Sequence, residues 1–435
     1  MNRKYWLAIF LLTGLLLRLI ISFPTFSGDV TNHMVWGEIG AKHGLKGLYE
    51  VDFPKLYKHI APNYPPFAIF AFTFLFLLKQ WIYQLAWFLN LHIPFFPSNF
   101  IFILRDFDYY PYLLKLPAII ADIGIAWISF LFAKKIVKKR KSSFPLIILL
   151  LVLFNPAYFY NSAYWGQTDS VPLFFLLVSF YLLLYSSKFI RAGLFFILGL
   201  LFKQTIVIFI PLFAILLYIK SNIRLFSMTL IASLLLFVIS FIPFAYKQNV
   251  LFYPFLTYWN KILLVSGLPY TSNHAFNLWF LVTGSRKVFA SSHFLSGLSY
   301  EQWGYLLVGL IYLLLLMKLY KDKFKIESIL YVGFLIPFAS FLFLTKMHER
   351  HLILTLPFLL LLTYKNKFLL SCFLFISLFN LINMYHSWWS PHFYPLEKVL
   401  SQDSVLNFLT ILLLGVFSAS LINYFKLSFL REKKI

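Results

Sequence analysis

Long apolar runs constrain this chain more than any motif does. Hydrophobic residues make up 61% of its 435 residues and charged residues only 12%, which is more apolar surface than one soluble core can bury. Many runs approach the ~20 residues that a helix needs to cross a bilayer. They are continuous rather than alternating, which argues against the strands of a membrane barrel. The sequence therefore predicts an all-α, polytopic protein of the lipid bilayer.

The positive charges stand between these runs. Lys and Arg number 38 against 15 Asp and Glu, and because they form short blocks, membrane topology explains them better than a nucleic-acid partner does. Under the positive-inside rule the blocks and both termini are expected in the cytoplasm. The blocks are Met1 to Lys4, Lys134 to Lys141, Lys188 with Arg191, Lys220 with Arg224, Lys318 to Lys325, Lys365 with Lys367, and Lys426 to Lys434.

About fourteen apolar segments are expected. They are 5–23, 66–78, 81–104, 112–132, 144–160, 171–185, 193–202, 205–218, 225–243, 304–317, 328–344, 352–362, 369–384 and 405–424. The first follows Arg3 and Lys4 like a signal peptide, but no small-residue cleavage site follows it, so we expect a retained helix. Cys372 is the single cysteine and lies in an apolar run, so no disulfide is expected.

Two of these predictions concern interrupted segments. Segment 81–104 contains Pro94 and Pro97. We expect it to cross, because otherwise the block beginning at Lys134 would face outside; the alternative is a segment lying on the membrane surface. Segments 193–202 and 205–218 are short, which predicts a broken pair with Lys203 at the break.

No linker, repeat or soluble domain is evident, so the sequence predicts one membrane domain, 1–435. Its first extracytoplasmic loop spans 24–65 and is expected to contain interfacial helices. A second large loop spans 244–300. Polar residues collect at the predicted extracytoplasmic ends of the segments, which indicates a site on that face. They are Asp29, Lys115, Asp122, Gln167, Asp169, Lys203, Asn273, His348, Glu349 and Arg350.

Several of these residues also suit a structural role. Asp29 shares a predicted helix face with His33 and Trp36, but it also suits a helix cap or first turn. Asp169 suits the cap of a turn. Lys203 is costly in hydrocarbon unless it faces a cavity or an anion, and snorkelling to the interface is the alternative.

The same is true of three further features. Trp165 suits an interfacial aromatic belt. Lys115 and Asp122 are seven residues apart on one helix face, so they can also pair with neighbours. Residues 345–351 concentrate more ionisable groups than a plain turn needs.

The motifs in chain order resemble a known family. They are Gly28-Asp29, His33, Trp36, Glu38-Ile39, Tyr64-Pro65-Pro66, Phe202-Lys203-Gln204-Thr205, Asn277-Leu278-Trp279 and His348-Glu349-Arg350. This pattern is similar to the polyprenyl-phosphate-sugar-dependent glycosyltransferases of the GT-C fold, most of all to the dolichyl-phosphate-glucose α-1,3-glucosyltransferases of N-glycan precursor assembly. The matches are short islands between Gly28 and Arg350.

The resemblance implies roles for individual residues. Asp29 would be the general base, and positive groups would bind the departing phosphate: Lys203, His348, Arg350 and Lys115. Substrate contacts would come from His33, Trp36, Trp165, Gln167, Asp169, Gln204, Asn277 and Glu349. The implied partners are a polyprenyl-phosphate sugar donor and a lipid-linked glycan or other extracytoplasmic acceptor. No cofactor is expected, since the first loop has no paired acids, and metal dependence stays open.

The sequence departs from that family in two places. The turn Trp165-Gly166-Gln167-Thr168-Asp169 stands where the eukaryotic family has His-Phe-Gln-Tyr-Asn, and the second loop lacks the family's acidic stretch. The sugar and the acceptor therefore stay open. The bias toward Lys, Phe and Ile indicates a prokaryotic source, and hence a multi-pass protein of the plasma membrane.

Two other classes share some of these features. A transporter or flippase of a lipid-linked saccharide would also have many spans and a buried lysine, but its polar groups would be expected near the midplane and its halves to repeat. A noncatalytic lipid-binding protein would be expected to have a first loop poor in charge.

Overall fold

The structure is a computed structural model that describes residues 3–137, 142–246, 249–265, 268–364 and 366–426. The regular structure of this part of the chain is helical apart from four strands of two or three residues, and loops join the elements. Met1, Asn2, Lys365 and the residues of two basic blocks, 138–141 and 427–434, lie outside the described residues.

Nine helices of the described chain are long and apolar enough to cross a membrane. Because these helices dominate it, the protein is a helical integral membrane protein, as the sequence predicts. They are α1 (Arg3–Ser22), α4 (Pro66–His92), α6 (Tyr110–Ile136), the run Phe144–Trp165, the run Ile223–Phe244, α15 (Tyr300–Lys321), α16 (Ile326–Phe343), α18 (Lys367–Trp388) and α20 (Asp403–Lys426). Four shorter apolar runs accompany them: Ser170–Ser186, Phe189–Phe202, Gln204–Lys220 and His351–Leu362.

The remaining elements are short, or are parts of these runs. The helices are α2 (Gly28–His43), η1 (Leu48–Glu50), α3 (Phe53–Tyr57), α5 (Asn99–Asp106), α7 (Phe144–Leu153), α8 (Pro156–Phe159), η2 (Tyr160–Trp165), α9 (Ser170–Tyr181), η3 (Leu182–Ser186), α10 (Phe189–Phe202), η4 (Gln204–Phe209), α11 (Ile210–Lys220), α12 (Ile223–Phe241), η5 (Ile242–Phe244), α13 (Tyr253–Thr257), η6 (Tyr258–Leu263), α14 (Leu278–Thr283), η7 (His351–Thr355), α17 (Leu356–Leu362) and α19 (Tyr394–Leu400). The strands are β1 (Ser272–Asn273), β2 (His293–Leu295), β3 (Leu298–Ser299) and β4 (Met347–His348).

By its internal contacts the chain divides into two compact units. The first comprises residues 1–128, 159–207 and 216–266, and the second comprises 129–158, 208–215 and 267–435. The single membrane domain expected from the sequence stays a prediction. The second large loop is shared between the units, because its residues up to 266 belong to the first and those from 267 to the second.

In the first unit, α2 packs along α4. The two backbones come close because α2 carries glycine at the contact: a Cβ on Gly37 would lie 2.7 Å from the backbone of Phe72. Val30 and Trp36 of α2 are buried in the same apolar core. Protein therefore covers the inner face of α2, and its expected position on the membrane surface stays untested. Elsewhere in this unit, α10 packs against both α9 and α12.

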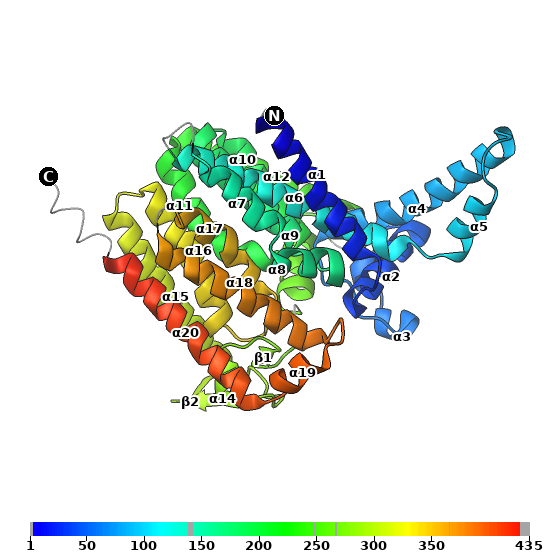
Figure 1. Cartoon of the computed structure of the whole chain (residues 1–435). Helices are drawn as coiled ribbons and strands as arrows, with labels where there is room; N and C mark the ends of the chain where they lie inside the picture. The colour runs from blue at the N-terminus through cyan, green and yellow to red at the C-terminus, as the bar shows by residue number, and fades with distance from the viewer. Residues whose placement is uncertain (1–2, 138–141, 247–248, 266–267, 365, 427–435) are drawn as a thin grey trace. The chain divides into compact units, whose positions relative to one another are not determined.

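The predicted break between segments 66–78 and 81–104 is wrong. One helix, α4, runs from Pro66 to His92, because Lys79 and Gln80 are good helix formers and Lys79 pairs with Asp108 at 2.7 Å. The helix ends before Pro94, and α5 then packs back along α4 (Figure 1). The α4–α5 hairpin is formed by this turn, with α5 (8 residues) much shorter than α4 (27 residues), and the expected crossing of segment 81–104 stays a prediction.

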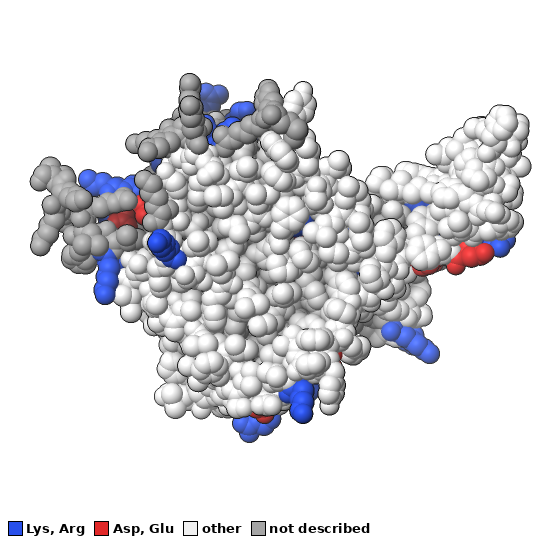
Figure 2. All heavy atoms as spheres, in the orientation of Figure 1, with Lys and Arg blue, Asp and Glu red and all other residues white. Residues whose placement is uncertain are grey.

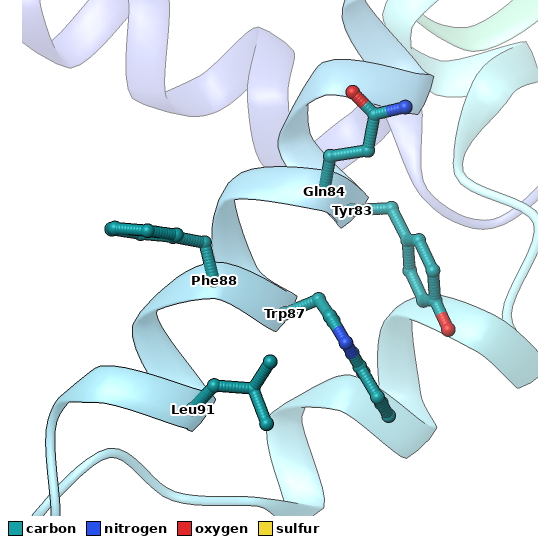
Figure 3. Close-up of a pocket in the computed structure, with 5 residues that line it drawn as sticks. All are labelled: Tyr83, Gln84, Trp87, Phe88 and Leu91. Carbon is teal, nitrogen blue, oxygen red and sulfur yellow. The ribbon is translucent and has the colours of Figure 1, made fainter.

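The α4–α5 hairpin is strongly apolar. No Asp, Glu, Lys or Arg occurs from residue 80 to residue 104, and the surface of the hairpin is nearly free of charge except along one edge (Figure 2). A shallow groove of about 310 Å³ lies on α4, lined by Tyr83, Gln84, Trp87, Phe88 and Leu91 (Figure 3). None of the predicted site residues lines this groove.

A buried ion pair joins α1 to α6. Arg18 Nε lies 2.8 Å from Asp122 Oδ2, and both side chains are fully buried. Two hydroxyls complete the carboxylate's contacts: Ser162 Oγ donates to Oδ2 at 2.6 Å and Ser170 Oγ to Oδ1 at 2.5 Å. One carboxylate therefore fixes α1, η2 and the start of α9.

In the second unit, α16 is the central helix. It is 83% buried and packs against α15, α17, η7 and α20. The parallel pairing of β1 with β4 places Asn273 opposite His348. Chain segments 75 residues apart are thus adjacent.

Removing the carboxylate of Asp122 should destabilise the protein strongly. Asp122→Ala leaves the Arg18 guanidinium buried without its counter-ion, and breaking such a pair typically costs about 3–5 kcal/mol. Unfolding of the purified chain in detergent measures the loss. The control is Asp106→Ala, which breaks the exposed Arg105–Asp106 pair and should leave the unfolding transition unchanged. Equal effects of the two variants would contradict a special role for the buried pair.

Candidate functional site

The candidate site begins with the carboxylate of Asp29. Asp29 lies in the first turn of α2, where Ser27 is the N-cap, so it is a first-turn residue and not the cap itself. Gln167 Nε2 donates to Asp29 Oδ2 at 2.6 Å. Two predicted site residues 138 positions apart are thus in direct contact, and the amide fixes the orientation of the carboxylate.

Lys203 is the second centre of the site. The sequence places it at a helix break, and this is confirmed: Lys203 is extended (φ −156°, ψ 137°) between α10 and η4. Its ammonium lies 2.9 Å from Asp169 Oδ1, and both side chains are at most 4% exposed. It also lies over the ring of Tyr64, 5.3 Å from the centroid. A buried ammonium is thus placed between one carboxylate and one aromatic face.

The ammonium of Lys203 is not fully satisfied. Despite the short distance to Asp169, Nζ makes no hydrogen bond of acceptable geometry within the described chain. Gln167 Oε1, Gln204 Oε1 and Thr205 Oγ1 are also buried without a partner there. Buried polar atoms are normally paired with protein, water or a ligand, so these four atoms are candidates for contact with a ligand.

The contacts close into a ring through His33. The His33 ring lies 5.0 Å from that of Tyr64 and stacks on Phe72 at 4.4 Å. One helical turn back along α2 is Asp29. We call Asp29, Gln167, Asp169, Lys203, Tyr64 and His33 the ring: four side-chain contacts join them, while Gln167 and Asp169 share one turn and Asp29 and His33 share one turn of α2. All six lie in the first unit.

The Gln167–Asp169 turn depends on Gly166. Gly166 ends η2 in the left-handed region (φ 86°), and a Cβ there would lie 2.6 Å from Val30 Cγ2 and 3.2 Å from Lys115 Cε. The preceding residue, Trp165, accepts a hydrogen bond from Ser27 N at 3.2 Å. The turn thus lies directly against the start of α2, which places Gln167 beside Asp29.

Lys115 has a different setting from Lys203. Its ammonium donates to three backbone carbonyls, those of Ser22 at 2.7 Å, Thr25 at 2.5 Å and Tyr164 at 2.9 Å. These bonds account for all three of its hydrogens. The predicted phosphate contact of Lys115 stays a prediction, and the geometry gives it a structural role that joins the end of α1 to the turn.

Two tryptophans predicted to contact substrate are enclosed by protein. Trp36 is 1% exposed, and its Nε1 donates to Ile60 O at 2.8 Å. Trp165 is 5% exposed and packs against Tyr160. Their contacts fit walls of the site better than surfaces open to a ligand.

The remaining predicted residues belong to the second unit. Glu349 is 2% exposed and pairs with Arg350 Nη1 at 2.6 Å, while His348 Nδ1 lies 3.8 Å from its other oxygen. Burial raises the pKa of Glu349, but the charge of Arg350 and the neighbouring His348 lower it by more, so its pKa lies well below the usual range. Glu349 is therefore an ionised side chain that offsets part of the positive charge of its neighbours.

Asn277 holds its loop to α16. Its Oδ1 accepts from Phe280 N at 3.1 Å, and its Nδ2 lies within reach of the carbonyls of Phe341 at 3.2 Å and Leu344 at 3.3 Å. Asn273 reaches the carbonyls of Leu268 and Lys346 in a similar way. The sugar contact implied for Asn277 stays a prediction, since these bonds already give its amide a structural role.

Among the described residues, no group of three or more His, Cys, Asp or Glu side chains is placed to hold a metal ion. The expectation of no cofactor stays a prediction.

Sequence reasoning missed two residues of this region. Arg18 is a charged residue inside an otherwise apolar first helix, and that position alone signals a buried partner. Tyr64 stands in the sequence only as part of the motif Tyr64-Pro65-Pro66, and no local signal places its ring under Lys203, because that contact joins the end of α10 to the end of the first loop.

The fold and the site define a helical integral membrane protein with a buried, partly unsatisfied polar ring. No protein-family model matches the chain, and no curated protein matches it.

Substituting Gly166 should disturb the turn that carries Gln167. In Gly166→Ala the left-handed conformation alone costs about 1–2 kcal/mol, and the clash with Val30 adds to it. Thermal unfolding in detergent measures the effect. Gly297→Ala is the matched control, because Gly297 also has a positive φ (78°) but open space around it. Gly166→Ala should therefore be the more destabilised variant, and equal shifts would show that the turn does not need the close contact.

Proposed function

We propose that this protein is a membrane glycosyltransferase that moves a hexose from a polyprenyl-phosphate-linked donor to a lipid-linked glycan or another extracytoplasmic acceptor. One observation carries the proposal: the buried ammonium of Lys203, held by Asp169 and Tyr64 but without a hydrogen-bond partner among the described residues. Such a group is costly in an apolar protein unless an anion uses it. A lipid phosphate is the anion that a membrane site meets.

The ring supplies the two chemical functions that sugar transfer needs. Asp29 would accept the proton of the acceptor hydroxyl, whose oxygen forms the new bond to the anomeric carbon. The bond from that carbon to the donor phosphate breaks, and the polyprenyl phosphate leaves with the electron pair. Lys203 would stabilise the charge that develops on the phosphate. Gln167, which contacts Asp29, would hold the base in position.

Membrane topology supports a site outside the cytoplasm. The ring residues stand at the junctions α1–α2, η2–α9 and α10–η4. Lys188 stands at the opposite end of α10, and Lys220 ends α11, the helix that continues from η4. With the positive end inside, the ring faces outward, where nucleotide sugars are absent and lipid-linked donors serve instead. The sequence has no Gly-rich nucleotide-binding motif.

The charged residues of the second unit, His348, Glu349 and Arg350, support this proposal less directly than Lys203 does. His348 and Arg350 are proposed further phosphate contacts, on the strength of the family resemblance. Because Glu349 is paired with Arg350, Arg350 would act with its charge partly offset. Lys203 is therefore the first residue to test.

Asp29→Asn should abolish most transfer while leaving the fold intact. Asn keeps the volume and an oxygen for Gln167, but it cannot take up the proton, so we expect a loss of about 10²-fold to 10⁴-fold in rate. The assay follows transfer from polyprenyl-phosphate glucose and polyprenyl-phosphate mannose in proteoliposomes. Glu38→Gln is the control, because Glu38 pairs with the exposed Lys42 of its own helix, outside the ring. Full activity of Asp29→Asn would remove Asp29 from the mechanism.

Lys203→Met should lower use of the donor. Met keeps the length of the side chain and removes the charge, and the loss of one such donor typically costs about 10²-fold to 10³-fold in rate. Lys79→Met is the control, because Lys79 pairs with Asp108 outside the ring. Movement of an intact donor across the bilayer, with no cleavage of its sugar–phosphate bond, would instead identify a flippase.

A further inference from the structure

The connection between α18 and α20 forms an open, shallow cavity on the surface of the second unit. Its volume is about 370 Å³, and it is lined by Trp389, His392, Tyr394, Glu397, Lys398 and Ser401. All six residues belong to the second unit, and none takes part in the ring around Lys203. The cavity combines aromatic rings with a carboxylate, an ammonium, an imidazole and a hydroxyl, which is an unusual set for the apolar surface of a membrane protein.

The carboxylate of Glu397 is fixed in one orientation. Its Oε1 accepts from Phe393 N at 2.9 Å and from the Tyr385 hydroxyl at 3.2 Å, and it lies 3.1 Å from His392 Nδ1. These three contacts all end on Oε1, so Oε2 is left to accept from a ligand; the side chain is 22% exposed. Partial desolvation raises the pKa of Glu397, but the hydrogen bonds from Phe393, His392 and Tyr385 lower it by more. The group is therefore an ionised, oriented acceptor.

The two aromatic residues of the cavity, Trp389 and Tyr394, differ in their surroundings. Trp389 is held in the left-handed region (φ 51°), which is unfavourable for a bulky residue. Its ring packs against Tyr385 at 5.5 Å and His386 at 4.8 Å, so α18 supports it from behind. Tyr394, on α19, is 75% exposed. Residues with a strained backbone, as Trp389 has, concentrate at ligand sites.

We infer that this cavity is a saccharide-binding site. The C–H faces of pyranose rings pack on aromatic faces, whose quadrupole is negative, while sugar hydroxyls donate to carboxylates and accept from ammonium groups. The volume lies at the lower end of small-molecule sites, which suits one or two sugar units. The inference does not depend on the proposed transfer.

An interfacial aromatic belt is the main competing explanation. Trp and Tyr also collect where helices leave the bilayer, and α18 ends here. A belt, however, needs no carboxylate held by three hydrogen bonds and no cavity. Lys398 is exposed and lines the same cavity, so an ammonium accompanies the carboxylate there, and this favours the saccharide.

Binding of defined saccharides to the full chain tests the inference. The protein is placed in phospholipid nanodiscs, because many detergents carry sugar headgroups that would compete. Maltose, mannobiose and N,N′-diacetylchitobiose are titrated, and saturation-transfer NMR measures binding. We expect saturable binding of at least one of them. Tyr394→Ala and Glu397→Gln should each weaken it about tenfold or more; Gln keeps an oxygen for Phe393 and Tyr385, so the fold should persist.

Two controls separate the outcomes. Tyr320→Ala removes a tyrosine that is 73% exposed elsewhere in the same unit and should not change binding. Saccharide binding by the native chain without any transfer would defeat the proposed function and leave this inference standing. Absence of saturable binding, or binding that neither Tyr394→Ala nor Glu397→Gln changes, would make the cavity an interfacial belt and overturn the inference.

Discussion

The carboxylate of Asp122 is the interaction on which the first unit depends. It neutralises Arg18 of α1 and accepts hydrogen bonds from Ser162 and Ser170. These two serines bracket residues 163–169, the turn that carries Gln167 and Asp169. In an apolar protein a polar turn needs internal partners, because lipid offers none. The buried ion pair therefore positions the candidate site without being part of it, and its loss should reach Asp29 through Gln167.

The Lys203–Asp169 pair is also buried, but unlike in the Arg18–Asp122 pair its cation makes no hydrogen bond among the described residues. The charge of Lys203 is balanced by Asp169 at 2.9 Å, yet the alignment is not that of a hydrogen bond. A buried pair in good geometry is a closed unit, because the attraction and the hydrogen bonds together offset the cost of desolvation. A pair in poor geometry retains donors for a third group. An incoming phosphate would use those donors and share the ammonium with Asp169, which explains why a carboxylate beside the cation need not prevent anion binding.

Local sequence signals predicted the membrane class, the break at Lys203 and the polar turn after η2. Each is encoded by neighbouring residues: a long apolar run, an interruption in one, or a cluster of Gly and polar residues. Pairings between distant segments could not be predicted this way. Arg18 and Asp122 are 104 residues apart, and Lys115 reaches carbonyls 49 to 93 residues away. The predicted break near Lys79 failed for the same reason, since its partner Asp108 follows only after the hairpin.

The polar residues of an apolar chain thus fall into two groups that residue type does not separate. Lys115 and Lys203 are both buried lysines, and both resemble phosphate ligands in the sequence. Lys115 donates to three carbonyls and has no hydrogen left, whereas Lys203 has an acid and an aromatic ring but no hydrogen bond among the described residues. Like Lys115, Asp122 and Asn277 have hydrogen-bond partners for their polar atoms. Like Lys203, Gln167 and Gln204 have a buried polar atom without a partner among the described residues. Because a satisfied polar group has little left to offer a ligand, Lys203 is a better candidate than Lys115 for contact with an anion.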